Sequence, residues 1–212
     1  MAITTYDELK SAIADWLQRD DLTAVIPTFI ALAEVQLFRT VRHRRMISRA
    51  TTTVDEEYEE LPADFLEIIS AKLDTSPPRV LTSIGILAME DKKEGDETNT
   101  PEFYAIIGDN LTFYPRPSGS DTLEIIYYAK PDALSDDNAS NALLEECPDL
   151  YLYGALLQAA PYLGDDGRIA TWGALYQQRM TDLENADSAS QVGATKLVTE
   201  IALSATNRRW MT

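Results

Sequence analysis

The sequence contains a single cysteine, Cys147, and a single histidine, His43, among its 212 residues. One cysteine excludes a disulfide within the chain and any metal site built from several cysteines, so we expect Cys147 to be a buried thiol. The chain also lacks a glycine-rich phosphate loop, a GxSxG nucleophile motif and an HExxH zinc motif. The sequence therefore offers no catalytic, cofactor-binding or metal-ligating residues, and we expect a protein without a cofactor that is not an enzyme.

Long apolar runs are absent as well. No run reaches the length of a membrane span, and the first ten residues lack the basic and then apolar order of a signal peptide. The hydrophobic content of 45% and the charged content of 25% are ordinary for a soluble globular protein of one or two domains. We therefore expect no membrane partner.

Basic residues are scarce. The chain has 18 Lys and Arg against 35 Asp and Glu, a net charge of −17, and the whole excess lies in residues 51–150, with 6 basic and 23 acidic residues. Such a surface repels nucleic acid, which argues against a sequence-specific DNA-binding protein. It suits solubility, or the passage of a polyanion that must not stick.

The segment 147–187 predicts two helices joined by a turn. Pro148 suits a first helical turn, no charged residue occurs from Leu150 to Leu163, and the Gly164–Gly167 turn ends the helix. Its apolar residues point all round, so we infer that one small domain cannot cover it alone and that packing between subunits does. The candidates for subunit packing are Tyr151, Tyr153, Gly154 and Leu157. The second helix has one apolar face, formed by Ile169, Trp172, Gly173, Tyr176, Met180 and Leu183.

Two helices are also predicted near the N-terminus. Thr5 to Glu8 forms a capping box, Asp20 and Asp21 mark a break, and Pro27 opens the second helix. That helix ends in a basic cluster, for which two interpretations stay open: favourable charge at a helix C-terminus, or a patch that meets an acidic partner surface or phosphate. The cluster comprises Arg39, Arg42, His43, Arg44, Arg45 and Arg49.

From residue 46 the pattern changes to that of strands. Strands are predicted at 46–54, 58–61, 66–73 and 122–128, with a hairpin of 103–107 and 111–114 around the Gly108–Asn110 turn and a short extended piece at 79–82. Ser83 is expected to cap a modest helix, and residues 92–100 to form a loop. The acidic run 55–60 lacks the ligand spacing of a calcium loop, so we interpret it as a solvated turn.

The last segment, 196–212, fits no single helical or strand period. It combines large apolar residues with two arginines and a tryptophan, which favours docking on another protein over a disordered terminus. The predicted fold class is α+β: mainly an α-helical bundle (1–45 and 132–190), an inserted small antiparallel β unit (46–131) and an extended C-terminal docking arm (191–212). The docking candidates are Leu197, Val198, Ile201, Leu203, Arg208, Arg209 and Trp210.

Several stretches together resemble the head-to-tail adaptor, or neck, proteins of tailed bacteriophages. The segment PDLYLYGALLQAAPYL at 148–163 is similar to a hallmark of that family, and further stretches agree in order. The resemblance covers most of residues 5–188 and is weakest in the C-terminal tail. The supporting stretches are TYDEL, DWL and RDDL near the N-terminus, IPTFIALAE at 26–34, LPADFLE at 61–67, and YYAK at 127–130 followed by an LSD linker.

The resemblance implies a structural virion protein. Such adaptors form a ring, commonly dodecameric, between the portal protein and the tail, and DNA passes through the central channel without specific binding. The C-terminal arm of each subunit contacts the portal. The implied location is the virion neck, with assembly in the host cytoplasm.

Two alternatives remain open at the level of sequence. The first is another tail-completion or assembly component with a similar scaffold. The second is a small hydrolase that works through clustered carboxylates, for which Asp165 and Asp166 are the pair to test.

Overall fold

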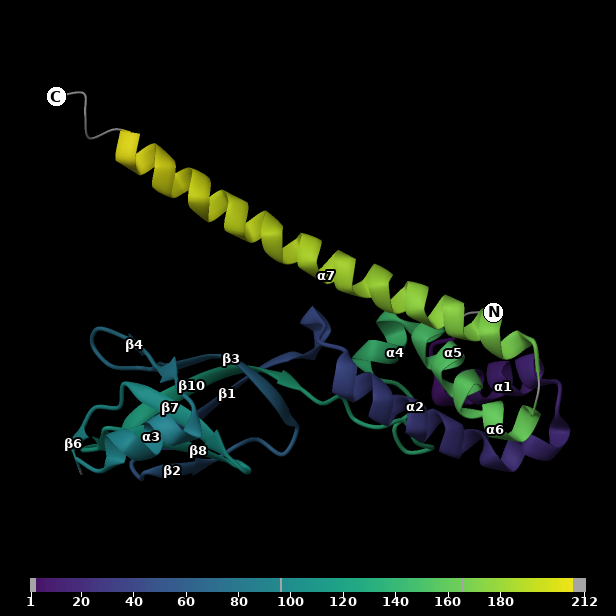
Figure 1. Cartoon of the computed structure of the whole chain (residues 1–212), viewed down its shortest axis with the longest axis horizontal. Helices are drawn as coiled ribbons and strands as arrows, with labels where there is room; N and C mark the ends of the chain where they lie inside the picture. Colours follow the sequence, from purple (N-terminus) through teal and green to yellow (C-terminus); the bar gives the residue numbers. More distant parts are fainter. Residues whose placement is uncertain (1–2, 96, 165, 208–212) are drawn as a thin grey trace. The chain divides into compact units, whose positions relative to one another are not determined.

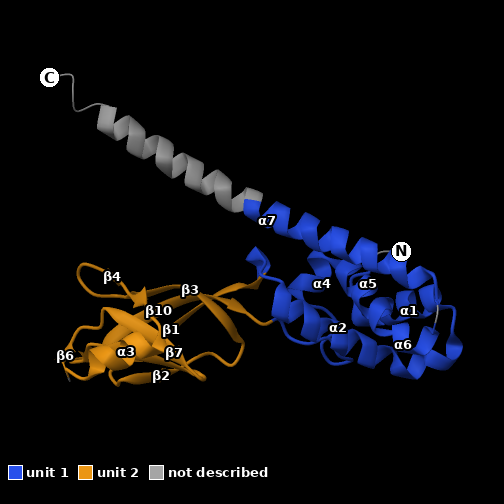
Figure 2. Cartoon of the chain, in the orientation of Figure 1, with its two compact units in different colours: residues 1–45, 131–212 blue, residues 46–130 orange. Residues whose placement is uncertain are grey.

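The computed structural model describes residues 3–95, 97–164 and 166–207, with side chains described as far as Ser188 (Figure 1). The chain divides into two compact units, Met1–Arg45 with Pro131–Thr212, and Met46–Lys130 (Figure 2). The first, called unit 1 below, is helical, and the second, unit 2, is built mainly of strands. The fold class is therefore α+β, as the sequence predicts.

Local signals explain where the helices of unit 1 begin. Both halves of the capping box between Thr5 and Glu8 form at the start of α1, and Asn141 caps α4 through the backbone N–H of Leu144. Pro27 and Pro148 lie in the first turns of α2 and α5, where the missing N–H costs nothing. The helices are α1 (Tyr6–Leu17), the 3-10 helix η1 (Asp20–Val25), α2 (Ile26–Thr40), α4 (Ala142–Glu146), α5 (Pro148–Gln158), α6 (Ala160–Leu163) and α7 (Arg168–Asn207); a further 3-10 turn, η2 (Arg44–Met46), lies where the chain passes into unit 2.

The apolar helix α5 is covered by its own unit. It packs against α1, α2, α4 and α7. Six of its residues, and Ala159 just beyond its end, are buried. The inference that this helix needs a second subunit to cover it is therefore wrong, because four neighbouring helices of the same unit suffice. The buried residues are Leu150, Tyr151, Leu152, Gly154, Ala155, Leu156 and Ala159.

Two helix boundaries differ from the prediction. The expected single helix to Leu163 is broken at Ala159 into α5 and α6, because Pro161 has no N–H to continue the hydrogen-bond ladder. Gly164, with a φ of +65°, then ends α6. The second helix, α7, continues beyond Asp187 to Asn207, where a loss of pattern was expected. No proline interrupts residues 168–207, so backbone hydrogen bonding can continue without an apolar stripe.

One segment of unit 1 meets the length and composition of a membrane span. In the described part of the chain it is Asp20–Thr40, which comprises η1 and α2. Its apolar residues Phe29, Ile30, Ala33 and Leu37 are each no more than 1% exposed, inside unit 1. These residues make α2 a core helix of unit 1, so its length and composition alone are weak evidence for a membrane span.

Unit 2 is built from two four-stranded sheets and a small two-stranded one, counted over the described residues. The first sheet, sheet A, has the order β1-β10-β3-β4, and the second, sheet B, has the order β2-β8-β7-β5. A common core includes Val54, Leu73, Leu111, Phe113 and Leu123. The strands are β1 (Ile47–Val54), β2 (Tyr58–Glu60), β3 (Phe65–Leu73), β4 (Arg79–Val80), β5 (Thr82–Ser83), β6 (Thr98–Asn99), β7 (Phe103–Ile107), β8 (Asn110–Tyr114), β9 (Arg116–Pro117) and β10 (Asp121–Ala129).

The hairpin of β7 and β8 is confirmed, and Gly108 supplies the positive φ of +62° that its turn needs. The strand after the Asp55–Glu56 turn, β2, pairs with β8 and not with β1. The helix α3 (Ile86–Lys93) begins after Gly85, and Ser83 lies in β5 instead of capping it. Residues 92–100 are not a simple loop, since α3 includes Lys93 and β6 lies at Thr98–Asn99.

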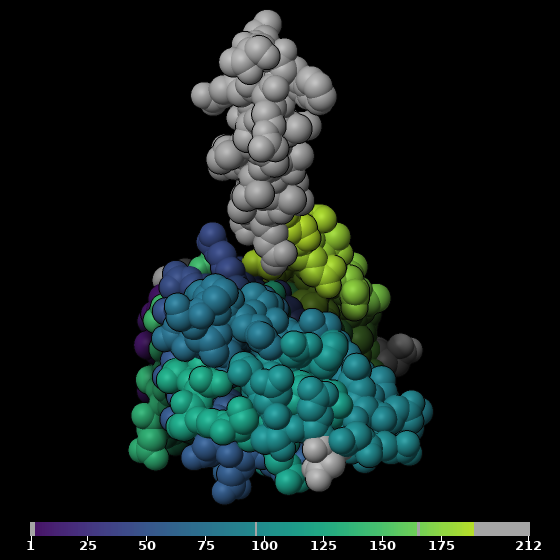
Figure 3. Space-filling view, turned by 90° about the vertical axis from the view of Figure 1, so that its left-hand side faces the viewer, coloured from purple at the N-terminus to yellow at the C-terminus, as the bar shows by residue number. Residues whose placement is uncertain are grey.

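Pairing in unit 2 is mostly antiparallel. The exceptions are the short parallel pairs β5–β7 and β6–β9. Figure 3 views the chain from the end of unit 2 at which β4 and β6 lie.

Candidate interaction sites

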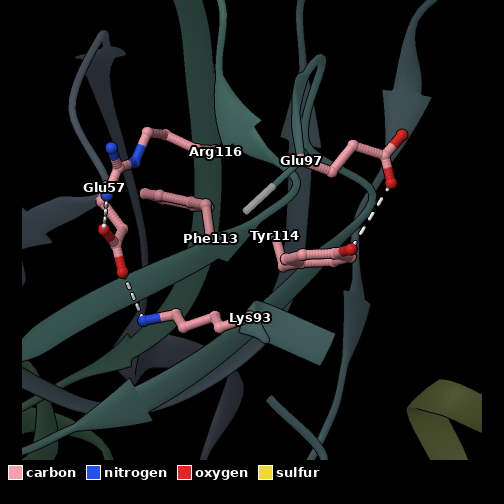
Figure 4. A pocket seen from close by; sticks show the side chains of 6 residues that line it. All are labelled: Glu57, Lys93, Glu97, Phe113, Tyr114 and Arg116. Atoms are coloured by element: carbon pink, nitrogen blue, oxygen red, sulfur yellow. Dashed lines mark hydrogen bonds and ion pairs between the residues drawn. The ribbon is translucent and has the colours of Figure 1, made fainter. Parts of the chain in front are cut away.

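An ionic cluster in unit 2 surrounds a small hollow (Figure 4). The carboxylate of Glu57 binds Lys93 Nζ at 2.5 Å and Arg116 Nη2 at 2.8 Å. Beside it, the hydroxyl of Tyr114 donates to Glu97 Oε2 at 3.4 Å. These residues come from five different segments: the turn before β2, the end of α3, the residue before β6, and the strands β8 and β9.

The hollow is about 50 Å³, well below the size of a pocket for a small-molecule substrate. The paired cation Lys93 mainly holds the pKa of Glu57 below its ordinary value, and Arg116 adds to the effect. A carboxylate that is ionised and already bound by two cations has a structural role. The predicted solvated turn is therefore correct for Asp55 and Glu56, which are exposed. It is wrong for Glu57, which is half-buried, and for residues 58–60, which form β2.

Replacing Glu57 by glutamine is expected to lower the free energy of unfolding by about 1 kcal/mol at pH 7, because two charge-assisted contacts are lost. A depressed folded-state pKa stabilises the fold above the unfolded value of about 4.5, and this contribution disappears as the pH falls through the lower folded pKa. Urea titrations at pH 7 and at pH 3 measure how much unfolding free energy the variant loses at each pH. The control is Glu90→Gln, because Glu90 is exposed and its carboxylate lies 4.0 Å from Lys93 Nζ. A loss of equal size at both pH values would contradict the assignment.

The basic cluster of residues 39–49 is largely satisfied within the chain. Arg42 Nη1 donates to the carbonyl oxygens of Phe38 and Val41 at the end of α2, at 3.1 and 2.9 Å. Arg45 Nε binds Glu146 at 3.2 Å, and Arg44 lies 3.8 Å from the same carboxylate. These contacts favour the helix C-terminus interpretation over a phosphate patch. Arg49 lies in β1 of unit 2 and pairs with Glu124.

The buried histidine of this cluster has a structural place. His43 is 4% exposed, and its Nδ1 accepts the backbone N–H of Arg45 at 3.3 Å. Asp187 of α7 accepts the backbone N–H of Arg44 at 3.2 Å. These bonds fix the segment after α2 to α7 within unit 1.

The four residues predicted to pack between subunits make contacts inside unit 1. The hydroxyl of Tyr151 lies 3.2 Å from Asn141 Oδ1, and the ring of Tyr153 packs edge-on against Trp16. A Cβ atom at Gly154 would lie 3.3 Å from Ala33 Cβ and 3.4 Å from the ring of Tyr176. Leu157 faces Gly173 of α7. The predicted docking residues Leu197, Val198, Ile201, Leu203, Arg208, Arg209 and Trp210 lie outside the described residues.

A buried polar network in unit 1 was missed by the sequence analysis. Glu34 is only 3% exposed, and its Oε1 accepts the backbone N–H of Leu134 at 3.0 Å. It also hydrogen-bonds the hydroxyl of Tyr151, whose pKa is raised mainly by burial. The sequence does indicate that Glu34 is buried. It follows Ile30 by four residues and precedes Leu37 by three, which places it on the apolar face of α2.

The side chains that could act as nucleophiles, acids or metal ligands are either isolated or already bound to another side chain of the chain. Cys147 is buried as expected, and burial raises the pKa of its thiol to about 11, which disfavours a thiolate nucleophile. Asp166 binds Arg168 at 2.7 Å, and Asp165 lies outside the described residues. Within the described part of the chain, no three His, Cys, Asp or Glu side chains are grouped so that they could hold a metal ion.

These observations define an α+β chain of two units whose candidate sites are surfaces and ionic contacts. Comparison with known families assigns it more closely. The family described as SU10 adaptor protein matches residues 4–197, so the chain belongs to that family. The resemblance seen in the sequence is thereby confirmed. No curated protein matches the chain.

Proposed function

We propose that the chain is a structural virion protein that joins the portal to the tail of a bacteriophage. In this proposal, copies of the chain form a ring, commonly a dodecamer, with a central channel for DNA. The observation that carries the proposal is the family match over residues 4–197. The protein acts by binding its neighbours and not as an enzyme.

The charge distribution supports a role beside DNA without specific binding. Unit 2 carries 17 acidic and 7 basic residues over positions 46–130. A surface of this sign repels a polyanion, so DNA can move past it without being held. The channel wall or an exposed face of the ring would have this property.

The helix α7 supports the proposed C-terminal arm. It is 40 residues long, about 60 Å at 1.5 Å per residue. Trp172, Tyr176 and Asp187 of this helix are buried in unit 1. A helix whose first half is anchored in this way can carry the docking segment, which begins within the same helix, toward the portal. In the proposal, the helical bundle (1–45 and 132–190) is the body of each subunit and residues 191–212 are the arm.

Deleting residues 196–212 is expected to abolish attachment to the portal while the circular dichroism spectrum keeps the strand signal and most of the helical signal. The physical reason is that α7 is anchored in unit 1 through Trp172, Tyr176 and Asp187, which the deletion leaves in place. A pull-down with the tagged portal protein of the same phage measures attachment, and a tail with the same composition in scrambled order is the control. Attachment at wild-type strength after deletion would refute the docking role of the segment.

A further inference from the structure

One edge of sheet A in unit 2 carries an open strand. β1 is the terminal strand of the sheet order β1-β10-β3-β4 and pairs with β10 at each of its eight residues, without a bulge. Within the described part of the chain, no strand therefore pairs with the outer backbone groups of β1. Natural edge strands are usually protected by proline, lysine, bulges or short length. β1 has none of these, and its one charged residue, Arg49, is bound to Glu124 on β10.

The strand that follows β1 is also an edge. β2 ends the order β2-β8-β7-β5 of sheet B, and the Asp55–Glu57 turn joins the two edge strands. Near this turn, Thr52 Oγ1 donates to Glu59 Oε2 at 3.3 Å and holds the two edges together. We call the opening between β1 and the segment 60–63 the seam.

The seam contains a groove of about 350 Å³. Its floor is apolar, because the side chains of Leu61, Leu111 and Ile125 line it and belong to the core of unit 2. The groove thus offers both an unpaired backbone and an apolar surface along the same strand. A second hollow of about 320 Å³ is also lined by the segment 60–63, together with Phe65, Gly108 and Asp109. The groove is lined by Ala50, Thr51, Thr52, Glu60, Leu61, Pro62, Ala63, Leu111 and Ile125.

The rim of the seam is acidic. Glu60 lines the groove, and Asp109 lines the adjoining hollow. Glu59 is half-buried beside Thr52, and its pKa is raised mainly by burial and further by Asp55 and Glu56. No cation is among the described contacts of the Glu59 carboxylate, so a basic side chain placed nearby would stabilise its ionised form.

We propose that the seam binds an extended segment of a partner protein that adds a strand to β1 and alternates apolar with basic residues. The apolar side chains of that segment contact Leu61, Leu111 and Ile125, and its basic side chains meet Glu59 and Glu60. Strand addition of this kind uses backbone hydrogen bonds for affinity and alternate side chains for specificity. A second copy of unit 2 fits less well, since two units with a net charge of −10 each repel one another.

The test uses the full chain and a dye-labelled peptide of ten residues that alternates valine with arginine and threonine. Fluorescence anisotropy measures binding, and amide hydrogen exchange locates it. We expect saturable binding and slower exchange in residues 47–54. A peptide with two central prolines, which cannot pair as a strand, is expected not to bind. Equal binding of the proline peptide, or unchanged exchange in β1, would overturn the proposal.

The charge contribution has its own variants. The double variant Glu59→Gln with Glu60→Gln is expected to bind the arginine peptide about tenfold more weakly. The matched control, Asp91→Asn with Glu94→Gln, removes the same charge at exposed positions of α3 and its C-terminus and is expected to bind within about twofold of the unmodified chain. Equal weakening by both double variants would refute the specific role of the rim.

Sedimentation of the unliganded chain tests the competing occupant. Self-association that slows exchange in residues 47–54 would show that a second copy occupies the seam and would overturn the proposal. None of these experiments contains the portal, so their failure leaves the proposed adaptor role to be judged by its own tests.

Discussion

Replacing Gly154 by aspartate is expected to lower the free energy of unfolding by about 3–5 kcal/mol, enough to unfold much of the protein. A Cβ atom at this position would lie 3.3 Å from Ala33 Cβ on α2 and 3.4 Å from the ring of Tyr176 on α7. Helix α5 would have to move away from two neighbours at once. The carboxylate would in addition be placed in a buried, apolar contact without a cation.

Thermal melting followed by circular dichroism measures this effect. Gly167→Asp is the matched control, because a Cβ atom there meets nothing within 4 Å and the residue directly precedes α7. The control is expected to melt within a few degrees of the unmodified chain, about what a surface substitution costs. Equal melting temperatures for Gly154→Asp and the unmodified chain would mean that α5 does not pack against α2 and α7 as described.

Replacing Glu34 by alanine is expected to cost about 3 kcal/mol. The backbone N–H of Leu134 would lose its acceptor, and the hydroxyl of Tyr151 would lose one of its two partners, in a region without solvent. Asn141 would still bind that hydroxyl, so the loss falls mainly on the N–H of Leu134. The segment that returns the chain from unit 2 to α4 would be held less firmly to α2.

Urea titrations of Glu34→Ala, Glu34→Gln and Gln36→Ala separate the contributions. Glutamine keeps a carbonyl oxygen as acceptor and is expected to lose less than half as much as alanine. Gln36 lies on the exposed side of α2, and its replacement is expected to cost under about 0.5 kcal/mol. A loss at Glu34→Ala no larger than at Gln36→Ala would show that the buried network does not stabilise unit 1.

Signals that act within a few residues predicted the structure best. The capping box at Thr5, the prolines at 27 and 148, and Gly108 each fix a backbone conformation locally, and each is found where the sequence placed it. Alternation of apolar residues located β1, β3, β7, β8 and β10 to within about two residues. The family resemblance rested on the order of such stretches and is confirmed over residues 4–197.

Features that depend on distant residues were not predictable in the same way. Strand β1 (Ile47–Val54) pairs with β10 (Asp121–Ala129), far later in the chain, and nothing in either sequence identifies the strand with which it pairs. The cover of α5 comes from α1 and α2, far earlier in the chain, so its all-round apolar surface did not show whether the partner is the same chain or another copy. The cation partners of Glu57 lie on α3 and β9, which made an acidic turn look wholly solvated.

The two surfaces proposed for binding are the arm at 191–212 and the seam beside β1. The arm can be deleted, and Glu59 and Glu60 at the rim of the seam can be replaced, without changing a described core residue of either unit. This separation makes the adaptor role testable with variants that fold normally.

Native mass spectrometry of the purified chain mixed with the portal protein of the same phage tests the central claim most directly, and electron micrographs of the same mixture locate the added mass. The account predicts a ring of copies bound at one end of the portal. A chain that stays monomeric and unbound at saturating portal concentration would contradict it.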